Sequence, residues 1–270
     1  MSDLETTVDP ADGLPAMVVG GARADRKLYF LEYYASMMSK MGAFNRRAYV
    51  ELCAGPGRVQ YQENGVFEDG SPLRAFKQAF TEFYYIELRE DYAAALEQRC
   101  RSREQLRPMR VVQGDCNERI KEIVPRLPPA GLTLAFIDPT NWQVNFETVR
   151  LLTGVQRIDL VVSMFLGSMK RVPRENRPDV DAFFGTDRWR TPPYTRPDGS
   201  VTLDGMMRCY REQLVGLGYL DHPAGREIAV KTKTGAPLYL LAFFSRHKLG
   251  YQFWEQAIKR EPGGQMTLPL

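Results

Sequence analysis

The sequence predicts an α/β fold built on a seven-stranded, mostly parallel sheet that ends in an antiparallel hairpin. Seven short segments rich in β-branched and aromatic residues recur along the chain, and amphipathic helical patterns separate most of them. Nearly continuous apolar strands that alternate with helices indicate a parallel sheet buried on both faces. The last two strand segments are separated only by "TGAP", which is a hairpin connection.

The elements follow in a regular order. The predicted strands are residues 48–54, 83–88, 109–115, 132–138, 158–164, 227–233 and 238–245. Covering helices are predicted over 89–105, 117–127 and 203–217, where apolar residues recur at helical spacing. A helix over about 26–41, capped by Asp25 and ended by Gly42, precedes the sheet, and "YQFWEQAIKR" closes the domain as a short helix. Five strands joined through helices and followed by a hairpin form the strand order of the Rossmann-like class I methyltransferases.

Length and composition indicate one domain. A chain of 270 residues with 44% apolar residues suits a single large globular unit, which we place at 25–260 with a lid insertion at about 166–200. Residues 1–24 and 261–270 are rich in Pro, Gly and polar residues and lack periodicity, so both tails are expected to be flexible.

Several classes of protein are excluded by composition. The apolar runs are far shorter than a bilayer span and the acidic N-terminus lacks a signal core, so we expect a cytoplasmic protein without membrane contact. The cysteines are scattered without a C-x-x-C pair and there are only two histidines, which predicts reduced thiols and no metal site. A net charge of +3 permits an anionic partner without requiring one.

The stretch "ELCAGPGRV", residues 51–59, follows the first strand and raises the question of a ligand cradle or a plain tight turn. Ligands of open α/β sheets bind beyond the carboxyl ends of the strands, where a glycine turn lets the backbone approach them. Glu51, Gly55 and Gly57 belong to this motif, while Glu87 and Asp115 end the next two strands. A glycine turn and two acids at consecutive strand ends favour an adenosine ligand over the plain turn.

The identity of that ligand follows from the acids and from a departure in spacing. Glu87 is placed to accept hydrogen bonds from two ribose hydroxyls, and Asp115 to accept one from an adenine amino group. No helix opens directly after the glycines: "RVQYQENGVFEDG" intervenes, and the next helix is predicted to start with Ser71 as its cap. A diphosphate would therefore lack its usual helix N-terminus, which favours S-adenosylmethionine over NAD.

The fourth strand ends in "FIDPTNW". A polar residue and a proline followed by an aromatic residue resemble the motif of amino methyltransferases, in which Asp138 would orient the acceptor, the carbonyl of Pro139 would hold it and Trp142 would stack on a base. The alternative is that Asp138 caps the next turn and Trp142 fills the edge of the core. The chain departs from the strict pattern of that motif, so both interpretations of Trp142 stay open.

Five further stretches, "YVELCAGPG", "DGSPLRAF", "FIDP", "FFGTDRW" and "SRHKLGYQFW", resemble the three-Cys-motif partner proteins, from about Lys27 to Leu268. The resemblance implies a bacterial protein with a methyltransferase-like fold and a radical-type iron–sulfur protein as its partner. It supplies no substrate and no catalytic residue. Where the family pattern continues with Phe-Gly after "FIDP", this chain has Thr140, Asn141 and Trp142, so a role carried over for this loop is in doubt.

Three segments bear on partners. The arginines within 99–110 are interpreted as a solvated link between helix and strand, whereas residues 170–196 mix arginines with aromatic residues, which suits phosphates and unstacked bases but equally a protein partner. The tail Gln265–Leu270, "QMTLPL", is similar to peptides that dock on the bacterial DNA sliding clamp, although it could also fold back onto the domain.

Together these features predict an S-adenosylmethionine-dependent methyltransferase that acts on nucleic acid, DNA or RNA, with an iron–sulfur partner. Two alternatives remain: a non-catalytic module that binds the partner, or a module that binds the cofactor and assists the partner's chemistry.

Overall fold

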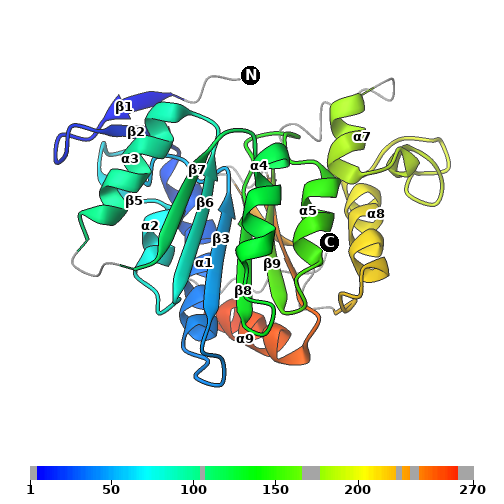
Figure 1. Cartoon of the computed structure of the whole chain (residues 1–270). Coiled ribbons are helices and arrows are strands. Elements are labelled where there is room, and N and C mark those ends of the chain that lie inside the picture. Colours follow the sequence, from blue (N-terminus) through cyan, green and yellow to red (C-terminus); the bar gives the residue numbers. More distant parts are fainter. Residues whose placement is uncertain (1–4, 104–106, 166–176, 223–226, 232–236, 261–270) are drawn as a thin grey trace.

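The computed structural model describes residues 5–103, 107–165, 177–222, 227–231 and 237–260. Its main sheet has seven strands in the order β10-β11-β9-β8-β3-β6-β7 (Figure 1). The strands are β3 (Arg47–Leu52), β6 (Glu82–Glu87), β7 (Met109–Gln113), β8 (Leu132–Ile137), β9 (Ile158–Phe165), β10 (Ile228–Lys231) and β11 (Pro237–Phe244). The five strands from β3 to β9 that belong to this sheet are parallel, and β11 runs antiparallel to β9 and β10. The predicted fold class and its C-terminal hairpin are confirmed.

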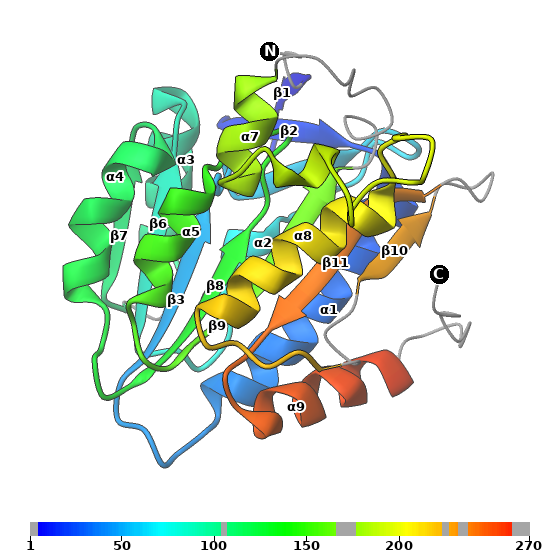
Figure 2. The ribbon, with the colours of Figure 1, turned by 90° about the vertical axis from the view of Figure 1, so that its right-hand side faces the viewer.

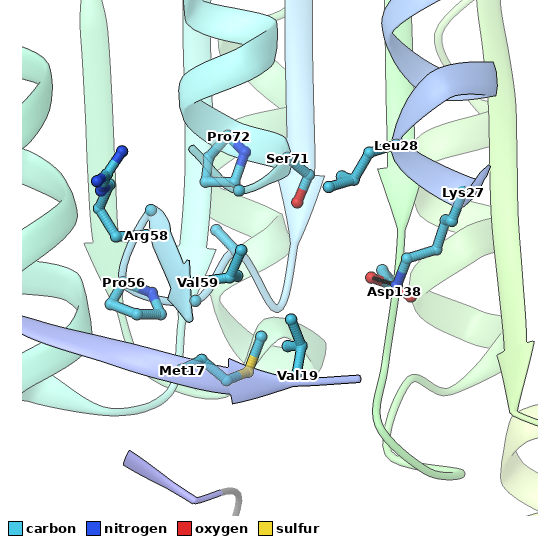
Figure 3. A pocket seen from close by; sticks show the side chains of 14 residues that line it. Met17, Val19, Lys27, Leu28, Pro56, Arg58, Val59, Ser71, Pro72 and Asp138 are labelled. Carbon is cyan, nitrogen blue, oxygen red and sulfur yellow. Dashed lines mark hydrogen bonds and ion pairs between the residues drawn. The ribbon is translucent and has the colours of Figure 1, made fainter. Parts of the chain in front are cut away.

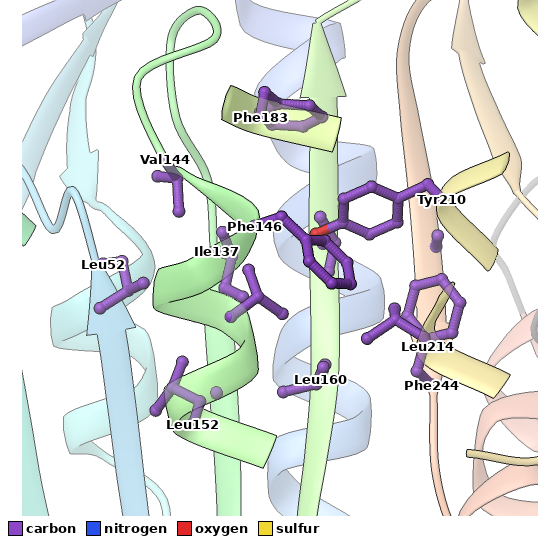
Figure 4. Packing of buried hydrophobic residues seen from close by; sticks show 14 of the residues in the cluster. Leu52, Ile137, Val144, Phe146, Leu152, Leu160, Phe183, Tyr210, Leu214 and Phe244 are labelled. Carbon is purple, nitrogen blue, oxygen red and sulfur yellow. The ribbon is translucent and has the colours of Figure 1, made fainter. Parts of the chain in front are cut away.

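Helices cover both faces of the sheet (Figures 1 and 2). One core cluster joins the sheet to α1 (Gly21–Ser39), α2 (Ser71–Phe76), α3 (Glu90–Arg101) and α9 (Lys248–Lys259). The other joins it to α4 (Cys116–Ile123), α5 (Phe146–Thr153), α7 (Pro178–Phe184) and α8 (Leu203–Gly216). Figure 4 shows side chains of α5, α7 and α8 against the sheet in this cluster. Short 3-10 turns lie at η1 (Val124–Arg126) and η2 (Arg188–Arg190). Among the helices described, none is long and apolar enough to span a membrane.

Period-two alternation assigns the residues of β3 to these two cores. Ala48, Val50 and Leu52 belong to the core of α4, α5, α7 and α8, whereas Tyr49 faces the opposite core, with α1 and α2. Glu51 lies on the same side as Tyr49 and is a buried carboxylic acid between apolar neighbours of this strand.

The N-terminal segment is structured, which differs from the expected flexible tail over residues 1–24. Strands β1 (Thr6–Val8) and β2 (Pro15–Val19) join β4 (Arg58–Tyr61) and β5 (Phe67–Asp69) in a second sheet ordered β1-β2-β4-β5. We call residues 5–19 the N-terminal arm. The strands of the arm are short and are held by ion pairs with residues distant in the sequence. For this reason the local pattern of apolar residues did not predict them. Helix α1 also begins earlier than expected, at Gly21 with Gly20 as its N-cap, so that Asp25 lies within the helix.

The segment between the glycine turn and α2 also has structure that the sequence did not indicate. Its two strands, β4 and β5, form an antiparallel hairpin, and no helix intervenes before α2, as expected. Gly70 is the N-cap of α2 and Ser71 is its first residue. The Ser71 hydroxyl donates a hydrogen bond to Glu51 Oε1 at 2.5 Å instead of capping the helix.

The described part of the predicted lid packs into the core. Phe183, Phe184, Trp189 and Tyr194 are each at most 2% exposed and form part of the cluster shared with α5 and α8. These rings are therefore not available to stack on bases, which corrects the interpretation of residues 170–196. Residues 166–176 lie outside the described part of the chain, as does the clamp-like tail Gln265–Leu270.

The late motif "SRHKLGYQFW" forms a corner at the amino ends of the parallel strands. Half-buried Asp159, near the start of β9, accepts a hydrogen bond from Tyr34 of α1 at 2.6 Å, and desolvation raises the pKa of this carboxyl to about 6. His247 caps α9 by accepting a hydrogen bond from the Leu249 N–H at 3.1 Å. Arg246 donates hydrogen bonds to four backbone carbonyls that lie beyond its own loop, those of Thr153, Val155, Gln156 and Leu217. The motif therefore fixes the packing of α1 and α9 at the end of the sheet away from the glycine turn.

Candidate ligand-binding site

The strand order reverses between β3 and β8. After β3 the chain adds β6 and β7 on one side, and it then returns to place β8 and β9 on the other. Such a switch point leaves a crevice at the carboxyl ends of the two central strands, where open α/β sheets bind ligands. The glycine turn, residues 53–57, follows β3, and Asp138 follows β8, so the sequence-predicted residues flank this crevice.

The glycine turn has a tightly constrained backbone. Gly55 and Gly57 have φ values of 67° and 88°, and Cys53, with φ 62°, is the only non-glycine residue with a positive φ in the described ranges. A Cβ atom on Gly57 would lie 3.0 Å from Leu96 and 3.1 Å from Leu73. The positive φ therefore favours glycine at position 57, and a Cβ atom there would also require Leu96 or Leu73 to shift.

Glu87 holds this turn from the end of β6. Its Oε2 accepts a hydrogen bond from the Gly55 N–H at 2.7 Å, and its Oε1 accepts one from the Arg89 N–H at 3.0 Å. Burial raises the pKa of the Glu87 carboxyl, although these backbone donors oppose the shift. Each carboxylate oxygen has a second lone pair, so Glu87 can fix the turn and still accept a hydrogen bond from a ligand.

Asp115 and Leu88 lie at the neighbouring strand ends. Asp115 is exposed and is the N-cap of α4, where its Oδ1 accepts a hydrogen bond from the Asn117 N–H at 2.8 Å. Leu88 directly follows Glu87 and is 56% exposed, which is unusual for a large apolar side chain at the end of a buried strand. Sequence reasoning missed Leu88, although an apolar residue directly after a strand-end acid was the signal that could have found it.

An ion pair joins α1 to the end of β8. Lys27 Nζ lies 2.5 Å from Asp138 Oδ2, and the two side chains are 13% and 18% exposed. The Lys27 ammonium also lies 4.9 Å from the ring centroid of Tyr239. Burial lowers the pKa of Lys27, but the interactions with the Asp138 carboxylate and with Tyr239 outweigh it, so that the pKa is raised overall. Lys27 was not predicted, because its partner is more than a hundred positions away in the sequence.

Glu51 is buried and acts inside the domain. It accepts hydrogen bonds from Tyr49 at 2.8 Å and from Ser71 at 2.5 Å, and it is 1% exposed. Burial raises the pKa of its carboxyl to about 8. Like Glu87 and Asp115, Glu51 is not among the residues that line the pocket at the glycine turn. It ties the start of α2 to β3, so it shapes the turn from behind and does not face the pocket.

The pocket itself lies between the glycine turn, α1, α2 and the N-terminal arm, and has a volume of about 50 Å³. Figure 3 shows Lys27 and Asp138 pointing toward one another at one end, with Met17 and Val19 of β2 pointing toward the turn. The remaining lining residues are Leu28, Ala54, Gly55, Pro56, Gly57, Arg58, Val59, Gly70, Ser71 and Pro72. The structure thus brings the glycine turn and Asp138 to one pocket and adds a wall from the arm.

Trp142 belongs to the core. It is 4% exposed, and its ring centroid lies 5.1 Å from that of Phe183 and 6.0 Å from that of Phe184 in α7. Of the two interpretations that the sequence left open, the structure favours the residue that fills the core edge over a stacking platform. Pro139 is buried between Asp138 and this loop.

Comparisons with known proteins show which solved structures have a similar fold. No protein-family model and no curated protein matches the sequence. Among solved structures, the protein LPL1258 from Legionella pneumophila has a TM-score of 0.51 at 12% identity, over 89% of this chain and 92% of that one. An O-methyltransferase from Bacillus cereus, solved with SAH, has a TM-score of 0.48 at 13% identity, over 81% and 80% of the two chains. The O-methyltransferase TomG from Streptomyces achromogenes, solved with SAM, has a TM-score of 0.45 at 16% identity, over 82% and 79%. At such identities the similarity concerns the fold alone.

Proposed function

We propose that this protein is an S-adenosylmethionine-dependent methyltransferase. One observation carries the proposal: at the switch point of a methyltransferase-type sheet, the buried carboxylate of Glu87 holds the N–H of Gly55 in a left-handed glycine turn. This arrangement puts an acceptor for ribose hydroxyls beside a backbone that a ligand can approach closely. When bound, the cofactor would supply an electrophilic methyl group.

The chain's own residues would then divide the remaining tasks. Gly55 and Gly57 give the ligand access to the backbone, Glu87 accepts from the ribose, and Asp115 accepts from the adenine amino group. The exposed side chain of Leu88 offers an apolar contact to the base. No phosphate-binding helix begins at the turn, because β4 and β5 intervene before α2, and this favours a ligand without a diphosphate.

Asp138 is the proposed group that orients the acceptor. Lys27 pairs with its Oδ2, which leaves Oδ1 to accept a hydrogen bond from an acceptor N–H or O–H. Nucleic acid remains the proposed acceptor class, on the strength of the Asp138-Pro139 pair at the end of β8. The iron–sulfur three-Cys-motif protein and the sliding clamp remain proposed partners.

Methyl transfer can be tested directly. The purified protein, with and without the iron–sulfur partner, is incubated with methyl-labelled S-adenosylmethionine and total bacterial DNA or RNA. The proposal expects label in one nucleic acid fraction with the wild type and none with Asp138→Asn, while this variant still binds S-adenosylhomocysteine. Absence of transfer with both partner and cofactor present would contradict the catalytic part of the proposal.

A cofactor-binding module that assists the partner is the second candidate. It is favoured by the burial of Trp142, Phe183 and Phe184, because these rings were the expected stacking platforms on the acceptor side and all lie in the core. Binding of S-adenosylhomocysteine without methyl transfer to any acceptor is the result that would select this candidate.

A further inference from the structure

We infer that Arg99 is a positioning residue that couples the N-terminal arm to the glycine turn, so that closure of the arm and occupancy of the pocket stabilise one another. The inference rests on the proposed function in one respect, namely that the ligand is an adenosine-containing cofactor. It assigns a role to a residue that the sequence placed in a solvated link.

Arg99 of α3 contacts both structures at once. Its Nε and Nη2 donate to the two carboxylate oxygens of Asp12 in the arm, at 2.7 and 2.9 Å. Its Nη1 donates to the carbonyl of Pro15 in the arm at 2.8 Å and to the carbonyl of Pro56 in the glycine turn at 2.7 Å. The side chain is 4% exposed. One buried guanidinium therefore fixes the distance between the arm and the turn.

The arm forms a wall of the pocket. Strand β2 pairs in parallel with β4 immediately after the turn, with Met17 opposite Val59. Met17 and Val19 line the pocket together with Gly55 and Gly57 (Figure 3). A second ion pair, between Arg58 of β4 and the buried Asp9 of the arm at 2.7 Å, fastens the same wall.

The closed arm leaves little room. A cavity of about 50 Å³ holds a few water molecules, whereas pockets for organic ligands of this size class usually enclose roughly 300–1,000 Å³. Glu87 and Asp115 do not line this cavity, so the adenosine itself would lie outside it. The part of the ligand that follows the glycine turn toward Asp138 would enter the cavity, and this requires the arm to move outward before the ligand binds. If the arm then closes on the ligand, the two equilibria are coupled, and the coupling is reciprocal. Closure of the arm raises the affinity for the ligand by some factor, and the bound ligand raises the equilibrium constant for closure by the same factor.

Arg99 is the residue through which this coupling is expected to run. Its bidentate pair with Asp12 exists only when the arm is closed, and its bond to Pro56 holds the turn in the same geometry. Loss of the guanidinium would leave Asp12 and three backbone carbonyls without this donor, all near the ligand site. The arm would then close less often, and the ligand would dissociate faster.

Two measurements on the full chain test the inference. Hydrogen exchange is measured at the four backbone amides within residues 15–19, those of positions 16 to 19, since Pro15 has no N–H. It is measured with and without S-adenosylhomocysteine, and affinity and dissociation rate are measured by calorimetry and stopped flow. In the wild type the ligand should slow arm exchange at least tenfold. Arg99→Met should weaken binding about tenfold, mostly through faster dissociation, and should lose most of the ligand-dependent protection. Arg101→Met, on the same helix with a 69% exposed side chain, is the matched control and should behave as the wild type.

The outcomes separate this inference from the proposed function. If Arg99→Met does not fold, Asp12→Asn replaces it, since that variant weakens the hold on the arm and keeps the bond from Arg99 to Pro56. Ligand binding with unaltered exchange of residues 15–19, or wild-type dissociation from both variants, overturns the inference alone. If S-adenosylhomocysteine does not bind the wild type at all, the proposed function fails and this inference fails with it.

Discussion

The ion pair between Lys27 and Asp138 is the strongest functional signal at the scale of single residues. Two charges with side chains only 13% and 18% exposed lose hydration, and packed apolar residues of similar size would often be at least as stable. A pair kept at the edge of a pocket under these conditions suggests selection for function over stability. Its position beside the glycine turn joins the two halves of the proposed site.

We predict that the two members of this pair depend on each other for stability. Lys27→Met alone should lower the free energy of unfolding by up to about 3 kcal/mol, because it leaves a poorly hydrated carboxylate unpaired. Asp138→Asn in the Lys27→Met background should cost at least about 1 kcal/mol less than in the wild type. Urea unfolding of the four proteins measures this coupling, and strictly additive effects would show that the pair is not coupled.

The buried Glu51 predicts a pH dependence of stability. Burial raises the pKa of its carboxyl from an ordinary value of 4.5 to about 8, so the folded state retains a proton that the unfolded state has released. The stabilising contribution is complete below pH 4.5 and is lost as the pH rises through 8. Glu51→Gln should therefore flatten the fall in unfolding free energy between about pH 5 and 8, measured by urea titration. Glu118→Gln on the exposed side of α4 serves as control, and equal pH profiles of Glu51→Gln and wild type would refute the assignment.

The residues of the proposed site differ in how well they can be predicted from the sequence. The positions of Gly55, Gly57, Glu87 and Asp115 were predictable because each lies at or shortly after the end of a recognisable strand, and these strand ends meet at one edge of a parallel sheet. Lys27 and Arg99 were not, since their roles arise from partners distant in the sequence. For Trp142 the sequence motif predicts the position, in the loop after β8. It does not predict whether the ring points to the core or to the crevice.

At the scale of elements, the corner formed by "SRHKLGYQFW" has a structural role. A Cβ atom on Gly250 of α9 would lie 2.5 Å from Ser245 Oγ and 3.1 Å from the Tyr34 hydroxyl. The close approach of α9 to β11 and α1 therefore depends on this glycine. Because the corner lies at the end of the sheet away from the glycine turn, changes here should alter stability without altering ligand affinity.

We predict that Gly250→Ala destabilises the protein by about 1–3 kcal/mol through overpacking, and leaves the affinity for S-adenosylhomocysteine unchanged in the folded fraction. Gly216→Ala at the end of α8 is the matched control. A Cβ atom there meets nothing within 4 Å, so this variant should be neutral or stabilised by up to about 1 kcal/mol. Thermal unfolding separates the two, and equal stability of both variants would contradict the packing argument.

Elements with their own periodicity were predictable, and elements held by distant contacts were not. The seven strands of the main sheet and the helices α3, α4 and α8 have apolar patterns long enough to identify, whereas the short helices α5 and α7 were not predicted. The strands of the arm and of the β4–β5 hairpin have three to five residues each and gain their stability from one another and from Asp9, Asp12, Arg58 and Arg99. Short strands of this kind become visible only once their partners are known.

At the scale of the whole molecule, both sheets contribute to the proposed cofactor site. The main sheet supplies the switch point between β3 and β8, and the small sheet places β2 over the glycine turn that follows β3. Figure 1 shows β1 and β2 beside α3 at the same end of the molecule as the carboxyl ends of β6 and β7. The proposed cofactor site thus lies between the main sheet, which has a common topology, and strand β2 of the N-terminal arm, which forms one wall of the pocket.

Calorimetric titration with S-adenosylhomocysteine tests the central claim most directly. The account predicts saturable one-to-one binding by the wild type, with a Kd on the order of micromolar. Glu87→Gln should weaken it by one to two decades, or roughly 1.5–3 kcal/mol, because the charged acceptor for the ribose hydroxyls is lost. Glu90→Gln, three residues away and exposed, should bind as the wild type does. Absence of saturable binding to the wild type, or equal binding by Glu87→Gln, would contradict a cofactor site at the carboxyl ends of β3 and β6.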